Sequence, residues 1–216
     1  MTFQRARRPE HKRQRYEAIL TAARELATRE GVRAVTLSDI AGAVGMHKSA
    51  LLRYFETREE IFLRVAQADW EDWAAAMTGA LAPLAPGSVA EVSAALARTL
   101  AERPLLCDVL THAPLNLERN VSMDAVRAYK RAAHAATVEV MAAARRVLPE
   151  LSEEDALDLV GATCMVAASL WQVTHPPPLL ADLYEHEPGL EHATLEFEPT
   201  IVRLATTLIL GIRART

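Results

Sequence analysis

Apolar residues in this chain recur at steps of three and four, and no stretch alternates apolar with polar residues as a half-buried strand does. Alanine, a strong helix former, supplies 40 of the 216 residues. Half of the residues are apolar, which is enough for a hydrophobic core and excludes a disordered chain. Two distant cysteines exclude a disulfide scaffold. The sequence therefore predicts an all-α protein of about nine helices.

The first quarter of the chain predicts one long helix followed by two short ones. Apolar residues at helical spacing predict a helix over 13–29, and Gly31 follows as its stop. A short helix is expected over 37–44, and a second short helix over 47–55. Gly45 stands between them and permits a sharp turn. The predicted arrangement is a helix-turn-helix held by a longer helix.

The rest of the chain predicts further helices separated by clear breaks. The predicted ranges are 58–76, 88–103, a helix that begins at Pro104, 123–148, 152–175 and 197–212. Segment 82–87 has two prolines and a glycine and cannot be a continuous helix. Ser88 and Glu91 have the spacing of a capping box. Residues 179–195 are expected to form a loop with short helical turns.

The helix-turn-helix has a geometric purpose, because the major groove of DNA is about 12 Å wide and admits a single helix. Such a helix needs a small core on one side and a polar face on the other. The residues expected to close the core are Ile40, Val44, Met46, Leu51 and Phe55. The opposite face is then left to His47, Lys48, Ser49, Leu52 and Arg53.

Charge is unevenly distributed along the chain. Residues 1–55 hold 11 Lys and Arg against 5 Asp and Glu, a local charge of +6, whereas the remainder carries −10. The formal charge of −4 hides this difference. The asymmetry indicates two modules with different partners, although a basic surface also serves solubility or protein binding.

Residues 13–62 resemble the DNA-binding domain of TetR-family (tetracycline-repressor-like) regulators. The resemblance is carried, in order and spacing, by Ala22–Leu26, Glu30–Val32, Thr36–Ala41, Gly45–Met46 and Leu51–Ile61. The chain departs from the family pattern at Ala27 (commonly Phe), His47 (a hydroxyl cap), Leu52 (Tyr) and Arg58 (Lys). Leucine has no donor for the phosphate that the family's tyrosine contacts, so Leu52 is left to touch a thymine methyl.

The resemblance implies which residues contact DNA. They are Thr36, Ser38, His47, Lys48, Ser49, Leu52, Arg53, Tyr54 and Arg58. Lys48, Ser49 and Arg53 are expected at base edges, because Lys and Arg donate to the acceptors of guanine. Tyr54, Arg58 and the amino end of the second helix are expected at phosphates.

Three regions follow from these patterns. Residues 1–12 are expected to form a flexible basic arm, which either reaches the DNA or is merely attracted to it. Residues 13–58 form the helix-turn-helix domain, and 59–216 a helical ligand-binding and dimerisation domain, as the resemblance implies. The helices at about 155–171 and 197–212 carry small residues that permit close approach, so two copies would form a four-helix interface. The alternative is that they pack within one chain.

A ligand site has candidates but no motif. Residues beside helices that should line the interior are Trp70, Trp73, Cys107, His112, Asn116, Tyr129, His134, Met165 and Trp171, each of which is more often an ordinary core residue. No metal site, cofactor motif or catalytic pattern occurs, so an enzyme is unsupported.

The sequence thus predicts a cytoplasmic, sequence-specific DNA-binding regulator: a homodimeric, ligand-responsive repressor of a palindromic operator, with an unknown small-molecule effector and no membrane contact. Two alternatives remain open. One is a nonspecific DNA-binding architectural protein, and the other is a helical small-molecule-binding protein with an incidental basic N-terminus.

Overall fold

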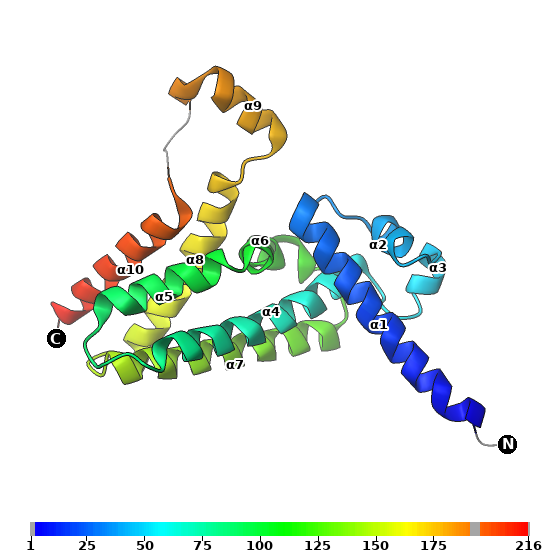
Figure 1. Cartoon of the computed structure of the whole chain (residues 1–216), viewed down its shortest axis with the longest axis horizontal. Helices are drawn as coiled ribbons and strands as arrows, with labels where there is room; N and C mark the ends of the chain where they lie inside the picture. Colours follow the sequence, from blue (N-terminus) through cyan, green and yellow to red (C-terminus); the bar gives the residue numbers. More distant parts are fainter. Residues whose placement is uncertain (1–2, 191–194, 216) are drawn as a thin grey trace.

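The computed structural model describes residues 3–190 and 195–215, and every regular element in this part of the chain is helical (Figure 1). The α-helices are α1 (Phe3–Glu30), α2 (Leu37–Ala43), α3 (Lys48–Leu51), α4 (Arg58–Leu81), α5 (Val89–Ala101), α6 (Pro104–His112), α7 (Met123–Val147), α8 (Glu153–Thr174), α9 (Pro178–His186) and α10 (Phe197–Arg213). A π-helix (Ala113–Leu117) follows α6, and a 3₁₀ turn (Pro188–Leu190) follows α9. The all-α prediction is confirmed.

Helices α1 to α3 form the N-terminal domain at one end of the elongated molecule (Figure 1). Its core is the predicted one: Ile40, Leu51 and Phe55 are buried, and Val44 and Met46 are half-buried against them. The ring of Tyr16 on α1 stacks on Phe55 at a centroid distance of 4.7 Å. This contact fixes the two short helices against the long one.

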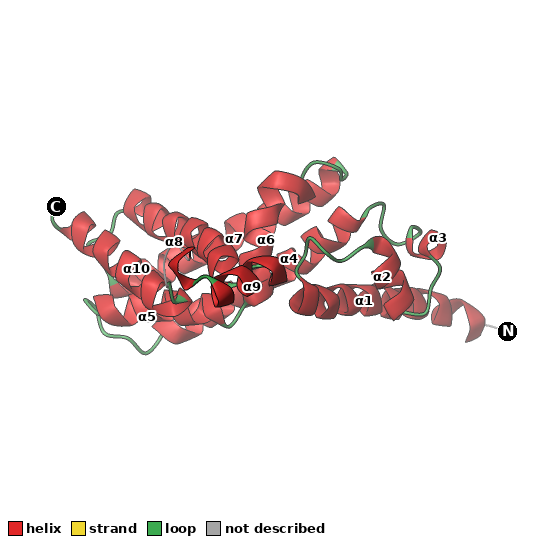
Figure 2. Cartoon of the chain, turned by 90° about the horizontal axis from the view of Figure 1, so that it is seen from above, coloured by secondary structure: helices red, strands yellow, loops and turns green. Residues whose placement is uncertain are grey.

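Helices α4 to α8 and α10 form the larger C-terminal domain. Helices α4 and α7 run side by side along it, and α10 lies against α5 and α8 (Figures 1 and 2). Trp73 of α4 is fully buried at the centre and its indole nitrogen donates to the Thr99 hydroxyl at 3.1 Å. The residues of α4 predicted to face inward, Ile61, Phe62, Val65 and Trp73, are all buried.

Helix α9, which follows α8, projects from the body of the molecule (Figure 1). The prediction for residues 179–195 is a loop with short helical turns, and the structure has the 3₁₀ turn Pro188–Leu190 but also a regular helix, α9 (Pro178–His186), none of whose residues is buried. Pro178 occupies the first turn, where its fixed backbone angle suits a helix and its missing N–H costs nothing. Residues 191–194 lie outside the described part of the chain.

The helix boundaries differ from the prediction at three further points, one of which is the end of α4 at Leu81 instead of residue 76. Helix α1 begins at Phe3, so the expected flexible arm 1–12 is helical where it is described. Straight-chain residues such as Lys12 and Gln14 favour the helical state, and Arg13 pairs with Glu10 one turn away. The third helix ends at Leu51 and continues as a turn through Tyr54.

The capping box predicted at Ser88 is wrong, because the Ser88 side chain makes no cap hydrogen bond. Its ψ angle is 70°, whereas the true boxes at Thr36 and Ser152 have extended backbones with ψ of 165° and 172°. An extended backbone is what aims the hydroxyl at the amide three residues on.

Helix α8 is largely apolar. Among the described residues it alone is long and apolar enough, by length and composition, to cross a membrane. Only 44% of its most apolar window is buried inside the protein, against α6 and α10. Its exposed side is therefore available to a partner.

Candidate nucleic-acid interface and domain junction

Helix α2 begins with a complete capping box. The Thr36 hydroxyl accepts from the Asp39 amide at 3.2 Å and donates to the Asp39 carboxylate at 2.6 Å. These hydrogen bonds hold the pKa of Asp39 below its ordinary value, so a carboxylate charge stands at this end of α2. The hydroxyl of Thr36 is thereby used within the protein, and Ser38 remains exposed.

Helix α3 presents its predicted polar face to solvent. Lys48, Ser49, Leu52 and Arg53 are exposed, while Leu51 points into the core. His47 precedes the helix, is exposed and makes no side-chain cap bond. One short segment, α3 and the turn that follows it, thus presents two cations, a hydroxyl and a leucine, which are residue types suited to direct readout of base edges.

Tyr54 and Arg58 lie differently from the rest of the predicted contacts. Tyr54 is half-buried against the core of the N-terminal domain. Arg58 donates to the backbone carbonyls of Val32 and Val35 and pairs with Glu59 at 3.1 Å. Each of the three guanidinium nitrogens of Arg58 therefore has a partner, and a phosphate contact by Arg58 would require these bonds to break.

The loop after α1 is fastened to the C-terminal domain by Asp108 of α6. Gly31 has φ of +81°, a conformation natural to glycine, and it turns the chain so that the amide of Val32 donates to Asp108 Oδ2 at 2.7 Å. Gln172 donates to Oδ1 of the same carboxylate at 2.9 Å, and His112 Nε2 lies 3.4 Å from it. Asp108 thus binds the amide of Val32, and Arg58 binds its carbonyl. We call this arrangement the Val32 clasp.

The electrostatics of the clasp favour a charged carboxylate. Burial raises the pKa of Asp108, but the hydrogen bonds from His112, Val32 and Gln172 outweigh burial and leave the pKa below its ordinary value. A buried carboxylate that accepts several hydrogen bonds holds its donors in place strongly.

A second polar link joins the two domains further along α1. Arg24 pairs with Asp69 of α4, which is 6% exposed. Burial raises the pKa of Asp69 above its ordinary value, although Arg24 acts in the opposite direction. The N-terminal domain is therefore tied to both α4 and α6.

Four of the nine residues proposed for a ligand site belong to a filled core. Trp70 donates to the Tyr129 hydroxyl at 3.4 Å, and Trp73 contacts Thr99. Cys107 is fully buried, and burial raises the pKa of its thiol to about 12. All four side chains belong to the buried hydrophobic cluster of the protein.

The other five candidates do not share one interior site. His134 and Met165 are exposed side chains on α7 and α8, whose other faces line the interior. His112, Asn116 and Trp171 lie at the domain junction. Periodicity alone does not predict that His134 and Met165 lie on the outer faces of α7 and α8.

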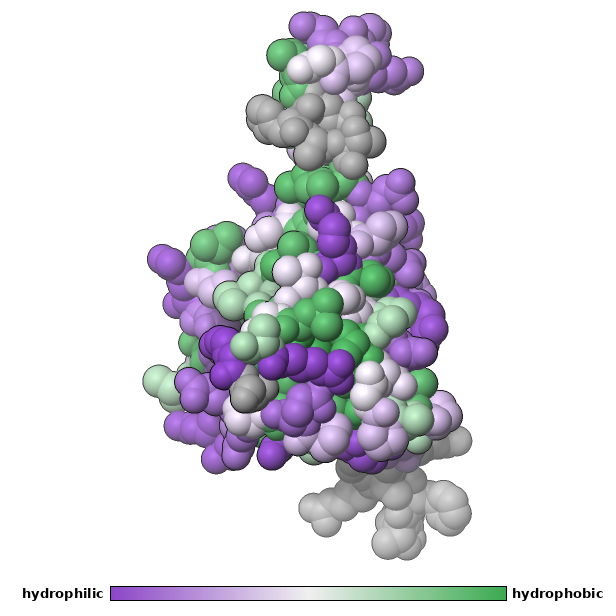
Figure 3. Space-filling view, turned by 90° about the vertical axis from the view of Figure 1, so that its left-hand side faces the viewer, coloured by the Kyte–Doolittle hydropathy of each residue, from purple (hydrophilic) through white to green (hydrophobic). Residues whose placement is uncertain are grey.

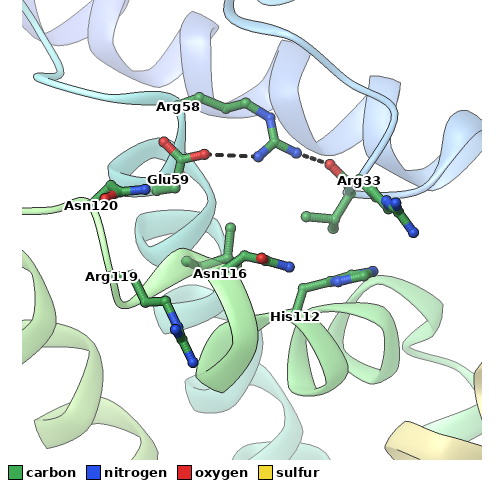
Figure 4. Close-up of a pocket in the computed structure, with 9 residues that line it drawn as sticks. Arg33, Arg58, Glu59, His112, Asn116, Arg119 and Asn120 are labelled. Atoms are coloured by element: carbon green, nitrogen blue, oxygen red, sulfur yellow. Dashed lines mark hydrogen bonds and ion pairs between the residues drawn. The ribbon is translucent and has the colours of Figure 1, made fainter.

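Two of the pockets at the junction are lined by residues proposed for a ligand site. One of about 270 Å³ is lined by Val32, Arg33, Arg58, Glu59, His112, Asn116, Leu117, Arg119 and Asn120 (Figure 4). The other, of about 780 Å³, extends from the end of α1 to Trp171 and the three prolines after α8. Sequence reasoning missed Arg33, Asp108 and Arg119, whose neighbours come from distant parts of the chain.

An apolar surface lies at the opposite end of the molecule (Figure 3). A shallow groove between α8 and α10 is lined by Ala162, Thr163, Val166, Ile201, Leu204, Ala205 and Leu208. Met165 and Val173 of α8 are 68% and 56% exposed. We call these residues the α8–α10 face.

Comparison with known proteins identifies the class. Residues 19–65 match the family model described as bacterial regulatory proteins, tetR family, and residues 67–216 match the tetracyclin repressor-like C-terminal domain. A search of the curated proteins finds no match to this chain.

Solved structures share the fold at low identity. A putative TetR-family transcriptional regulator from Mesorhizobium loti is 13% identical with a TM-score of 0.61, over 94% of this chain and 96% of that one. The fatty acid degradation regulator FadR from Bacillus halodurans is 14% identical with a TM-score of 0.57, over 91% and 98%. FadR from Bacillus subtilis, solved in complex with stearoyl-CoA, is 14% identical with a TM-score of 0.55, over 91% and 97%.

The chain belongs to the TetR family, because the two family models together span nearly all of it. It is a DNA-binding transcriptional regulator with a helix-turn-helix domain and a helical C-terminal domain. Regulators of this family are generally not enzymes.

The Val32 clasp predicts the effect of Asp108→Ala. The buried amide of Val32 and the amide of Gln172 lose their acceptor, so we expect the free energy of unfolding to fall by about 1–3 kcal/mol. Because the folded-state pKa of Asp108 is lowered, the difference from wild type is complete above about pH 4, and it shrinks as falling pH protonates the folded carboxylate. Urea unfolding followed by circular dichroism measures it.

The matched control is Asp182→Ala, because Asp182 is an exposed aspartate of α9. It should change the unfolding free energy by no more than about 0.5 kcal/mol. Equal unfolding midpoints for wild type and Asp108→Ala, with unchanged hydrogen exchange at the Val32 amide, would contradict the clasp.

Proposed function

We propose that this protein is a ligand-responsive transcriptional repressor that binds a palindromic operator as a homodimer in the cytoplasm. The observation that carries the proposal is the surface of α3 and the turn after it, where Lys48, Ser49 and Arg53 are exposed and Leu51 is buried. The acidic remainder of the chain keeps nucleic-acid binding to this one domain.

On DNA, α3 would lie in the major groove. Lys48 and Arg53 would donate to guanine O6 and N7, Ser49 to either kind of base, and Leu52 would contact a thymine methyl. Ser38 and Tyr54 would contact phosphates and set the position of the domain.

The α8–α10 face supports a homodimer. Exposed Met165, Val173 and Leu204 surround a groove of small and apolar residues, and a second copy would cover this face with the same face of its own. A two-fold dimer carries two α3 helices. Its operator would then be an inverted repeat with half-site centres about 34 Å apart.

The ligand response would act through the connections between the domains. Helix α4 begins beside the N-terminal domain and runs through the C-terminal domain, where it packs along α7. A ligand that prefers one orientation of α4 would shift the population toward that state and change the separation of the two α3 helices. An operator that fits the two α3 helices at one separation would bind them poorly at the other.

Arg53→Ala separates specific from nonspecific DNA binding. We expect discrimination at one base pair of each half-site to fall about tenfold, because a side chain that donates to a guanine edge would be lost. Competition binding with operator variants at fixed salt measures it. A nonspecific architectural protein would instead lose affinity equally for every sequence.

Arg98→Ala is the control, since Arg98 is an exposed arginine on α5 and its removal changes the net charge equally. It should leave both affinity and discrimination unchanged. Ligand binding by a protein that retards no DNA fragment at low salt would favour the third possibility, a helical small-molecule-binding protein.

Met165→Glu tests the dimer. A charge placed on the α8–α10 face would be buried against its own symmetry mate, so we expect a monomer and the loss of cooperative operator binding. Sedimentation velocity measures the mass. Val138→Glu makes the same change at a 49% exposed site on α7 and should leave the dimer intact. A dimeric Met165→Glu protein would contradict the assigned interface.

A further inference from the structure

The pocket of about 270 Å³ at the domain junction is lined by residues of both domains (Figure 4). Arg33 comes from the loop after α1, Arg58 and Glu59 from the start of α4, and Asn116 from the π-helix. Arg119 and Asn120 follow the π-helix, before α7 begins. π-helical turns are rare and are frequent at functional sites.

Positive charge dominates the lining, which has three arginines against one glutamate. Glu59 pairs with Arg58, Glu118 with Lys130 at 2.7 Å, and Glu30 with Arg29 at 3.6 Å. The carboxylate of Asp108, beside His112, instead accepts hydrogen bonds from Val32 and Gln172. Within the described part of the chain, Arg33 and Arg119 have neither an ion pair nor a side-chain hydrogen bond. They are the two uncompensated cations of the junction.

The pocket also offers polar groups that lack partners. The Nδ1 atom of His112 is buried without a hydrogen-bond partner among the described residues, and a buried polar atom of this kind calls for one. In Figure 4 the amide of Asn116 points across the pocket below Arg58, and Arg33 and Arg119 lie on opposite sides of the pocket. Both arginines are exposed, so turning a guanidinium inward needs only a rotamer change.

We propose that this pocket binds a small oxyanion, a phosphate or carboxylate group, between Arg33 of the N-terminal domain and Arg119 of the C-terminal domain. The volume of about 270 Å³ suits a small ligand, since pockets for drug-sized molecules begin at about 300 Å³. Guanidinium groups and amides are the donors that oxyanions accept from.

Occupancy of this pocket would act on the Val32 clasp. Arg33 follows Val32 in the chain, and His112 contacts Asp108, so an anion held by both domains would stabilise one orientation of the N-terminal domain. That regulatory consequence rests on the proposed function. The binding site itself does not.

Calorimetric titration of the full-length protein with sodium phosphate, at neutral pH and constant ionic strength, tests the site. We expect saturable binding of one phosphate per chain, weakened at least about tenfold in the Arg33→Ala/Arg119→Ala double variant. A parallel titration with sodium succinate distinguishes a carboxylate preference from a phosphate preference. Arg98→Ala should leave either affinity within about twofold of wild type.

Arg53→Ala distinguishes this pocket from the α3 face, which also attracts phosphate. Binding that is absent, or that is lost in Arg53→Ala and retained in the Arg33→Ala/Arg119→Ala variant, would overturn the proposal. Operator binding is measured separately on the same proteins. A protein that binds phosphate in the pocket but no specific operator would refute the proposed function alone, and the reverse result would refute the pocket alone.

Discussion

The backbone of Val32 is the point on which the two domains depend. Its amide is held by Asp108 of α6 and its carbonyl by Arg58 of α4. Because both partners are side chains with several further hydrogen bonds, the loop after α1 moves only if those elements move. The orientation of α3 is thereby linked to the helices that surround the C-terminal core.

The uneven distribution of charge along the chain corresponds to the two domains that this linkage joins. The basic first quarter offers Lys48 and Arg53 on an exposed helix face, and the acidic remainder lies on the far side of the junction. Arginines nevertheless collect where the two meet: Arg24 and Arg58 satisfy internal acceptors, while Arg33 and Arg119 do not. The junction is thus structurally and electrostatically distinct from both domains.

Much of the fold could be predicted from local signals. Helical periodicity predicted that Ile40, Leu51 and Phe55 lie in the core of the N-terminal domain, because apolar residues recur there within one or two helical turns. The residues of a ligand site could not be predicted in the same way, because periodicity does not show which helices pack against each other. Met165 and Tyr129 both lie on predicted helices, and the sequence pattern does not distinguish their surroundings. Met165 is exposed, whereas Tyr129 is buried. No signal in the sequence indicated Asp108, Arg33 and Arg119, because their neighbours are distant in the chain. The phosphate contact expected of Arg58 did not take account of the carbonyls of Val32 and Val35, to which it donates.

The account's central claim is that the exposed face of α3 reads a specific DNA sequence, once from each copy in a dimer. Genome-wide footprinting with the purified protein tests this claim most directly. The account predicts protected sites that share an inverted repeat with half-site centres about one helical turn, or 34 Å, apart. Protection spread over unrelated sequences, or sites with a single unrepeated half, would contradict it.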